Sequence, residues 1–268
     1  ELLMGNVIVA NITRTPVENG SNWGSVAAPS SVWAFEGLES SLDGLIAVDN
    51  TGGSNAVVWD AGGFARVTYN VAGTTGLRYT VPSGKFETLV SFQIRRHTNS
   101  CSKMIKTVSS NALIPVSPFA NYTIGPTAGG YSGSNLSVSY GEYGGDSGNQ
   151  FWVDGNIAGG ASPLARGAPT QTVVTPGGVA MSIDGSAWDT VEIWARFNST
   201  STQDGEWAIR LNGVVIFHWQ NVWNCSEPSV DEARNRAYIG LAEYTSSVGF
   251  YEDYRNFKIG YTRPGWLT

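Results

Sequence analysis

The feature that most constrains the fold is a tight turn, Asn212-Gly213, between two short alternating segments. Residues 207–211 precede the turn and residues 214–219 follow it. Asn-Gly supplies the positive φ values that a two-residue hairpin turn requires. The two segments are therefore predicted to pair as antiparallel strands.

The rest of the chain repeats short alternating segments between Gly-rich stretches, with no long helical period. Strands are predicted near residues 32–35, 45–48, 56–59, 65–70, 76–81, 87–96, 104–108, 122–124, 136–140, 150–153, 179–183, 190–197, 207–211, 214–219, 237–244 and 250–260. So many short strands favour an all-β fold, a two-sheet antiparallel jelly-roll sandwich.

Composition agrees with one domain over residues 1–268. Charged residues make up 14 % of the chain and there are 33 Gly, which is typical of strands joined by tight turns. Residues 1–31 are predicted to form an N-terminal strand or arm with a loop, and residues 32–268 the sandwich. The apolar segment 7–12 either begins the chain's own sheet or adds a strand to a second copy, which would make a homo-oligomer.

Charge and hydropathy exclude several partners. A net charge of −6 argues against nucleic acid, although a few cations focused in one groove could still bind an acidic polysaccharide. No run of about 18 apolar residues is present, so membrane insertion is not expected. The start at Glu1, without a signal-like segment, suggests a processed or cut chain. Cys101 and Cys225 form either one disulfide or two free thiols; we expect an extracellular or particle-surface location.

Alternation on the strand at 87–96 predicts a polar face. Val90, Phe92 and Ile94 point one way, which leaves Gln93 and Arg95 on the other side. His97 continues that polar row. Two later strands repeat the pattern with the side chains Glu192, Trp194, Arg196 and Arg210. These faces either line a groove or are an ordinary solvent-facing sheet surface.

Sugar binding would explain this mixture of side chains. Pyranose rings stack their C–H faces on Trp or Tyr, while hydroxyl and carboxylate groups bind Arg, Asn and Gln. The chain has 10 Trp and 11 Tyr. The residues predicted to bind substrate are Trp194, Arg196, Arg210, Glu192 and Tyr244.

The last quarter of the chain resembles concanavalin-A-like jelly rolls, which include lectins, glucanases and polysaccharide lyases. Asp204-Gly205-Glu206, five residues and Asn212-Gly213 match one motif, and the run from Tyr251 to Tyr254 matches an aromatic-x-Asp-aromatic closing strand. The resemblance implies a carbohydrate partner. It also implies a structural Ca²⁺ held by Glu36 and Asp253; alternatively these acids lie on the surface without a metal.

A second segment resembles jelly-roll glucuronan and alginate lyases. Ser102-Lys103-Met104 looks like the Gly-Lys-Leu/Met step that places a lysine at the groove of those enzymes, with Ser in place of Gly. Tyr140 stands where they keep a tyrosine. Their Arg-Ser/Thr-Glu-x-Arg and Tyr-Phe-Lys-Ala-Gly signatures are absent.

The residue types suit β-elimination from a uronic acid. This reaction needs a cation or amide that neutralises the carboxylate and a base that takes the C5 proton. The predicted catalytic set is His97, Arg95, Gln93, Lys103 and Tyr140, with His97 as the base. Glycoside hydrolysis is less favoured, because no Glu-x-Asp-x-x-Glu pair of carboxylates is present. The alternative to an enzyme is a glycan-binding or surface-structural module of a virion or filament.

Overall fold

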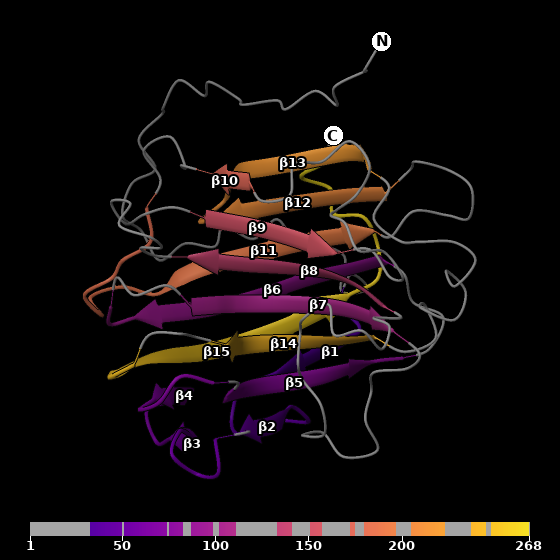
Figure 1. The fold of residues 1–268 in the computed structure, drawn as a ribbon. Helices are drawn as coiled ribbons and strands as arrows, with labels where there is room; N and C mark the ends of the chain where they lie inside the picture. Colours follow the sequence, from indigo (N-terminus) through magenta and orange to yellow (C-terminus); the bar gives the residue numbers. More distant parts are fainter. Residues whose placement is uncertain are drawn as a thin grey trace.

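The computed structural model describes residues 33–49, 51–73, 75–82, 87–98, 102–110, 133–140, 151–156, 172–174, 180–196, 205–222, 237–244 and 248–267. Within these ranges the chain forms fifteen strands, which pair antiparallel in two sheets (Figure 1). No helix in the described part is long and apolar enough to cross a membrane. The all-β antiparallel sandwich predicted from the sequence is confirmed.

The eight-stranded sheet, called sheet A, has the order β13-β12-β11-β6-β15-β4-β3, and β1 also pairs with β15. Its strands are β1 (Phe35–Gly37), β3 (Ala56–Asp60), β4 (Phe64–Tyr69), β6 (Glu87–Arg96), β11 (Asp189–Arg196), β12 (Gly205–Leu211), β13 (Val214–Val222) and β15 (Phe250–Gly260). The last of the described strands, β15, therefore lies in the interior of sheet A, between β6 on one side and β4 and β1 on the other.

The seven-stranded sheet, called sheet B, has the order β10-β9-β8-β7-β14-β5-β2. Its strands are β2 (Ile46–Asp49), β5 (Thr75–Val81), β7 (Ser102–Ser110), β8 (Gly133–Tyr140), β9 (Phe151–Asn156), β10 (Thr172–Val174) and β14 (Ala237–Tyr244). Strands β6 and β7 follow each other in the chain but belong to different sheets.

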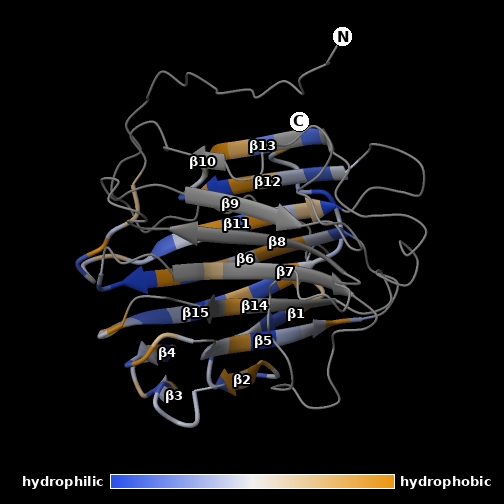
Figure 2. Ribbon diagram, viewed as in Figure 1, coloured by the Kyte–Doolittle hydropathy of each residue, from blue (hydrophilic) through white to orange (hydrophobic). Residues whose placement is uncertain are grey.

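The hydrophobic core lies between the sheets and follows the alternation of the strands. Val90, Phe92 and Ile94 of β6 are fully buried in one cluster with Leu77 of β5 and Leu241 of β14. Hydrophobic and hydrophilic residues both occur along β11, β12 and β15, as expected for strands with one apolar face (Figure 2). The outer face of sheet A, the face opposite the core, carries the other half of each strand.

One ion pair lies on the inner side of sheet A. Arg96 donates through Nε to Glu252 Oε1 at 2.8 Å, and both side chains are inaccessible to solvent. Tyr254 donates its hydroxyl to the other oxygen of Glu252 at 2.8 Å. Burial raises the pKa of Tyr254, and the adjacent Glu252 charge adds to this. The pair binds the end of β6 to β15.

The hairpin predicted at Asn212-Gly213 is confirmed. Asn212 has φ 47° and Gly213 φ 84°, and Leu211 pairs with Val214 across the turn. In contrast, the strand predicted near residues 179–183 is wrong where it can be compared, because residues 180–188 are irregular. The predicted N-terminal strand or arm, the strand at 122–124 and both cysteines lie outside the described residues.

Candidate functional site

The polar face predicted on β6 exists, and it lies on the outer face of sheet A. Gln93 and Arg95 alternate with the core residues Phe92 and Ile94, as the sequence pattern indicates. His97 follows the end of the strand. The structure shows, in addition, which partners these side chains have.

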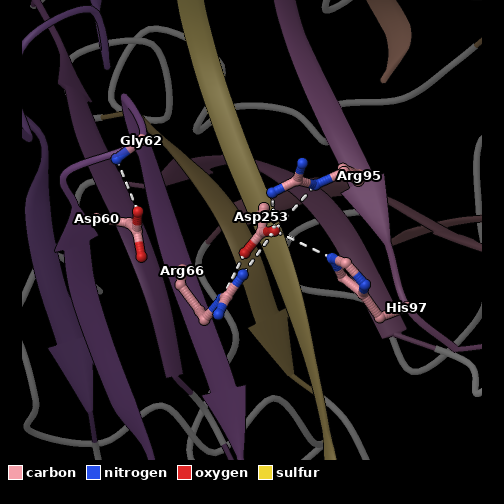
Figure 3. A network of polar contacts seen from close by, with 6 residues as sticks. All are labelled: Asp60, Gly62, Arg66, Arg95, His97 and Asp253. Atoms are coloured by element: carbon pink, nitrogen blue, oxygen red, sulfur yellow. Dashed lines mark hydrogen bonds and ion pairs between the residues drawn. The ribbon is translucent and has the colours of Figure 1, made fainter. Parts of the chain in front are cut away.

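The buried carboxylate of Asp253 on β15 is the shared hydrogen-bond partner of the polar side chains at this end of the face (Figure 3). Arg66 of β4 donates to both of its oxygens, at 2.7 and 3.1 Å. Arg95 donates to Oδ2 through Nε at 3.1 Å and Nη2 at 2.8 Å, and His97 Nε2 lies 3.0 Å from the same oxygen. Burial would raise the pKa of Asp253, but hydrogen bonds from Arg66, Arg95 and His97 more than offset this and lower it.

His97 is packed as well as hydrogen-bonded. Its ring lies 4.2 Å from the ring of Tyr251, measured between centroids. On another side it contacts Gly185, where a Cβ atom would collide with the imidazole. The backbone N–H of Gly185 donates to the carbonyl of Arg96 at 2.7 Å, which fixes this loop against the strand end. These contacts make His97 a partner of Asp253 and give no support to its predicted role as a base.

Gln93 is likewise engaged with protein groups. Its Oε1 accepts hydrogen bonds from Arg255 Nε at 2.8 Å and Asn256 Nδ2 at 2.9 Å, and its amide nitrogen lies 3.4 Å from the Thr190 hydroxyl. The amide therefore bridges β15 and β11 on the outer face.

Of the substrate-binding residues predicted on β11 and β12, Trp194 and Glu192 need a correction, whereas the roles of Arg196 and Arg210 stay predictions. Trp194 is fully buried, so it cannot stack on a sugar, and its indole N–H donates to Glu206 at 2.9 Å. Glu192 is also buried and accepts from Arg210 at 3.0 Å. Arg196 is half-buried and is paired with Glu87 of β6. Burial raises the pKa of Glu87, and the positive charge of Arg196 partly offsets this rise. Sequence alternation placed these side chains on one face, but it could not reveal what covers them.

The cover is the C-terminal segment of the chain. Leu267 forms a second, smaller apolar cluster with Leu89, Trp194 and Ala208, and Trp266 packs against it. The outer face of sheet A at this end thus carries a small additional core, which covers Trp194.

Glu206 holds this segment in place, and the sequence analysis missed its role. Arg263 donates to both of its oxygens, at 3.0 and 2.8 Å, and His218 Nε2 lies 2.8 Å from Oε1. Burial would raise the pKa of Glu206, but hydrogen bonds from Arg263, His218, Trp194 and Gln220 more than offset this and hold the pKa at about 2. Glu206 alternates with the core residue Trp207, and this pattern could have indicated from the sequence that Glu206 lies on the outer face.

Lys103, Tyr140 and Tyr244 belong to sheet B, where backbone pairing places them close together. Lys103 of β7 pairs with Tyr244 of β14 on one side and with Ser139 of β8 on the other. Tyr140 pairs with Ser102, the residue before Lys103, so by alternation Tyr140 belongs to the opposite face of the sheet from Lys103. The predicted catalytic set is therefore divided: Gln93, Arg95 and His97 lie on sheet A, and the lysine and tyrosines on sheet B.

Arg78 of β5 is a further cation on sheet B that the sequence analysis did not single out. Its neighbours Leu77 and Tyr79 pack in the inter-sheet core, so Arg78 points to the opposite face of the sheet. Its backbone pairs with Gly240, which in turn pairs with Lys106 of β7. The Leu-Arg-Tyr alternation was the available signal.

The two residues predicted to hold Ca²⁺ do not fit such a site in the arrangement observed. Asp253 binds two guanidinium groups and an imidazole, and Glu36 forms an ion pair with Lys258, the residue paired with it on β15. A Ca²⁺ site needs six or more oxygen ligands, not cations. Among the described residues, no three His, Cys, Asp or Glu side chains gather as metal ligands. Structural calcium stays a prediction that these two residues do not support.

Comparison with known proteins identifies the fold. No protein-family model and no curated protein matches the chain. Among solved structures, an endo-β-1,4-glucuronan lyase from the fungus Trichoderma reesei aligns with a TM-score of 0.53 at 13 % identity, over 86 % of this chain and 96 % of the lyase. The chain has a concanavalin-A-like jelly-roll fold.

Two further structures extend the comparison. A mutant of alginate lyase Aly36B in complex with alginate trisaccharide has a TM-score of 0.52 at 14 % identity, over 82 % of this chain and 99 % of the other. The carbohydrate recognition domain of Emp46p has a TM-score of 0.50 at 10 % identity, over 83 % and 91 % of the two chains. Polysaccharide lyases and a carbohydrate-binding domain therefore share this fold, and at such low identity the comparison shows the fold alone.

Proposed function

We propose that this protein binds a uronate-containing polysaccharide across sheet B and cleaves it by β-elimination. The observation that carries the proposal is the strand register, which places Lys103 between Tyr244 and Ser139 of the neighbouring strands, on one face of sheet B. The lyases that share the fold support the choice of reaction. Extracellular or particle-surface action on a polymer, with association of copies through residues 7–12, belongs to the same proposal.

The chemistry needs three functions, and sheet B has residue types for each. Lys103 and Arg78 supply positive charge that neutralises the uronate carboxylate and acidifies the C5 proton. Tyr244, as its phenolate, takes this proton beside the lysine, the C4–O4 bond breaks as the C4=C5 double bond forms, and Tyr244 then returns the proton to the departing O4. An adjacent cation lowers the pKa of a tyrosine from its usual value of about 10, which favours proton removal.

The base is a tyrosine and not a histidine in this proposal, because of where the histidines are. The chain contains 2 His. His97 is hydrogen-bonded to Asp253 and His218 to Glu206, and both carboxylates lie on the outer face of sheet A. A base on sheet B is therefore provided by Tyr or Lys.

The test is the formation of unsaturated product from polyglucuronate, polymannuronate and polygalacturonate, followed by ultraviolet absorbance. Lys103→Ala and Tyr244→Phe are expected to lower the rate by about 100-fold or more, the effect of removing a positioned acid–base or charge-stabilising group. His97→Gln is the control on sheet A and should keep the rate within a few-fold of the parent protein. Normal activity of Tyr244→Phe together with loss in His97→Gln would reverse the assignment of the two sheets.

A non-catalytic glycan-binding module is the second candidate. The observation in its favour is that the fold is shared with a carbohydrate recognition domain. Retention of the protein on immobilised polyuronate, without unsaturated product under any condition, would favour this candidate over the lyase.

A further inference from the structure

The outer face of sheet A carries an excess of positive charge next to Asp253. The guanidinium groups of Arg66 and Arg95 bind this single buried carboxylate, and the guanidinium group of Arg255 is close enough to Arg95 for the two charges to repel each other. Asp60 adds a longer-range attraction on Arg66. Three cations thus face two carboxylates on a protein whose net charge is −6. The arginine patch is defined as these arginines with the rings beside them, namely Arg66, Arg95, Arg255, Phe64, Trp188 and Tyr251.

Arg255 is the member whose charge is least compensated. It donates to the neutral amide oxygen of Gln93 at 2.8 Å, and its guanidinium lies 4.0 Å from the centre of the Trp188 ring. No carboxylate hydrogen-bonds to it among the residues that the structure describes. Burial lowers the pKa of Arg255, and the charge of Arg95 adds to this. An incoming anion would relieve the repulsion between the two arginines.

Aromatic rings hold the patch in shape. Trp188 lies over Arg95, at 4.7 Å, as well as over Arg255. On the other side of Asp253, the guanidinium of Arg66 lies 4.2 Å from the centre of the Tyr251 ring. Ring contacts and the Asp253 bonds fix the guanidinium groups before any ligand binds, which reduces the entropy lost on binding.

The patch remains accessible to a ligand. The side chains of Arg66 and Arg95 are 33 % and 24 % exposed, although Asp253 beneath them is fully buried. Asp253 is therefore covered by the two arginine side chains, and part of each arginine side chain faces solvent. Figure 3 shows Asp253 between Arg66 on one strand and Arg95 with His97 on another.

We propose that the arginine patch is a second binding site, which takes the carboxylate or sulfate group of an acidic sugar residue on the side of the sandwich opposite sheet B. Guanidinium groups match such planar or multidentate anions, and half-exposed rings suit the C–H faces of a pyranose. The choice of a sugar as the carrier of the anion rests on the proposed function. With both sites occupied, one molecule would hold two polymer segments, on opposite faces.

The test measures the indole N–H signal of Trp188, a residue of the arginine patch, in ¹H–¹⁵N spectra of the full chain. The titrants are a glucuronate oligosaccharide, a sulfated gluco-oligosaccharide and a neutral gluco-oligosaccharide of equal length. The Lys103→Ala variant is used so that no cleavage occurs, and Trp188→Phe assigns the signal. The acidic sugars should give a saturable shift that weakens as salt screens the charges, and the neutral one should not. The glucuronate and sulfated arms show which anion binds more tightly.

Arg255→Gln is the decisive variant, since it removes one charge but leaves the Asp253 bonds intact. It is expected to raise the Kd about fivefold or more, a value between those of an exposed ion pair and a charged hydrogen bond. Lys258→Gln is the matched control, since it removes one charge from the same strand and face, outside the patch. Equal effects of the two variants, or no shift beyond that of sodium chloride, would overturn the proposal.

The two experiments distinguish failure of the arginine-patch proposal from failure of the lyase proposal. If unsaturated product forms but the Trp188 signal does not shift, the arginine patch is rejected as a binding site and the lyase site on sheet B is retained. A saturable Trp188 shift without any product keeps the arginine patch as a binding site and removes the proposed catalysis.

Discussion

Two buried carboxylates, Asp253 and Glu206, organise the outer face of sheet A. Each accepts hydrogen bonds from arginine and histidine side chains, and neither is more than slightly exposed. Such groups stabilise a protein only while their partners remain, because a buried charge without a counter-charge is costly.

Replacement of Asp253 by Asn should therefore destabilise the protein strongly. Arg66 and Arg95 would then face each other without the intervening carboxylate, and the expected loss is about 3–5 kcal/mol in the free energy of unfolding. Denaturant titration measures it. Glu36→Gln, in a partly exposed pair with Lys258, is the control and should change stability by less than about 1 kcal/mol.

The same pair of variants tests the calcium prediction. A shared Ca²⁺ would make Asp253→Asn and Glu36→Gln equally damaging, and a chelator would reproduce the loss in the parent protein. If stability is unchanged by the chelator and the two losses differ, the ion pairs alone account for both acids.

At the scale of elements, the Asn212-Gly213 turn shows where local sequence is sufficient. The turn depends on two positive φ values, and Asn212 also binds the start of β11: it accepts from the Thr190 N–H at 2.8 Å and donates to Asp189 at 2.7 Å. The backbone geometry of the turn and its hydrogen bonds to β11 therefore favour the same conformation.

Gly213→Ala is expected to lower stability by about 1–2 kcal/mol, because a Cβ strains a left-handed residue. Asn212→Gly keeps the backbone geometry and removes the two side-chain bonds, with an expected loss of about 1–2 kcal/mol. Thermal or denaturant unfolding of both variants measures these terms. A neutral Gly213→Ala would show that this turn conformation is not required.

The segment before β11 shows where local sequence is not sufficient. Met181 is buried and Ile183 packs against the core, so the apolar alternation is real. Yet the N–H of Ser182 donates to the Asp189 side chain at 2.8 Å instead of to a neighbouring strand. Alternation reports which side chains are buried, and strand formation also requires a backbone partner.

For the whole molecule, the sequence predicted the class of fold but not the assignment of strands to sheets. Arg95 and Lys103 are close in the chain, yet β6 and β7 belong to different sheets, and this divides the predicted catalytic set. The partner of Arg95 is 158 positions away, beyond the reach of any local pattern. Faces could be predicted from alternation; contacts between distant strands and the cover over Trp194 could not.

Acid stability is a property of the whole molecule that these contacts predict. The pKa of Glu206 is lowered from 4.5 to about 2. A depressed carboxyl pKa contributes stability above its unfolded value, and this contribution is lost as pH falls from about 4.5 towards 2; linkage gives about 3 kcal/mol for such a shift. Asp253 acts in the same direction, whereas burial raises the pKa of Glu192 and acts in the opposite one.

Unfolding free energies of the parent protein and Glu206→Gln, measured from pH 5 to pH 2, separate these contributions. The difference between the two proteins should shrink by about 3 kcal/mol over this range, because only the parent loses the Glu206 contribution. A constant difference would contradict the assignment of the low pKa to Glu206.

The position of β15 has a consequence for how the protein comes to fold. Strands β4 and β6 are synthesised well before β15, the strand that joins them, and Arg96 meets Glu252 across 156 positions. Contacts between such distant segments are slow to form, since a long loop must close first. During synthesis, the edges of β4 and β6 that pair with β15 therefore stay unpaired and open to aggregation until β15 has been made and inserts between them.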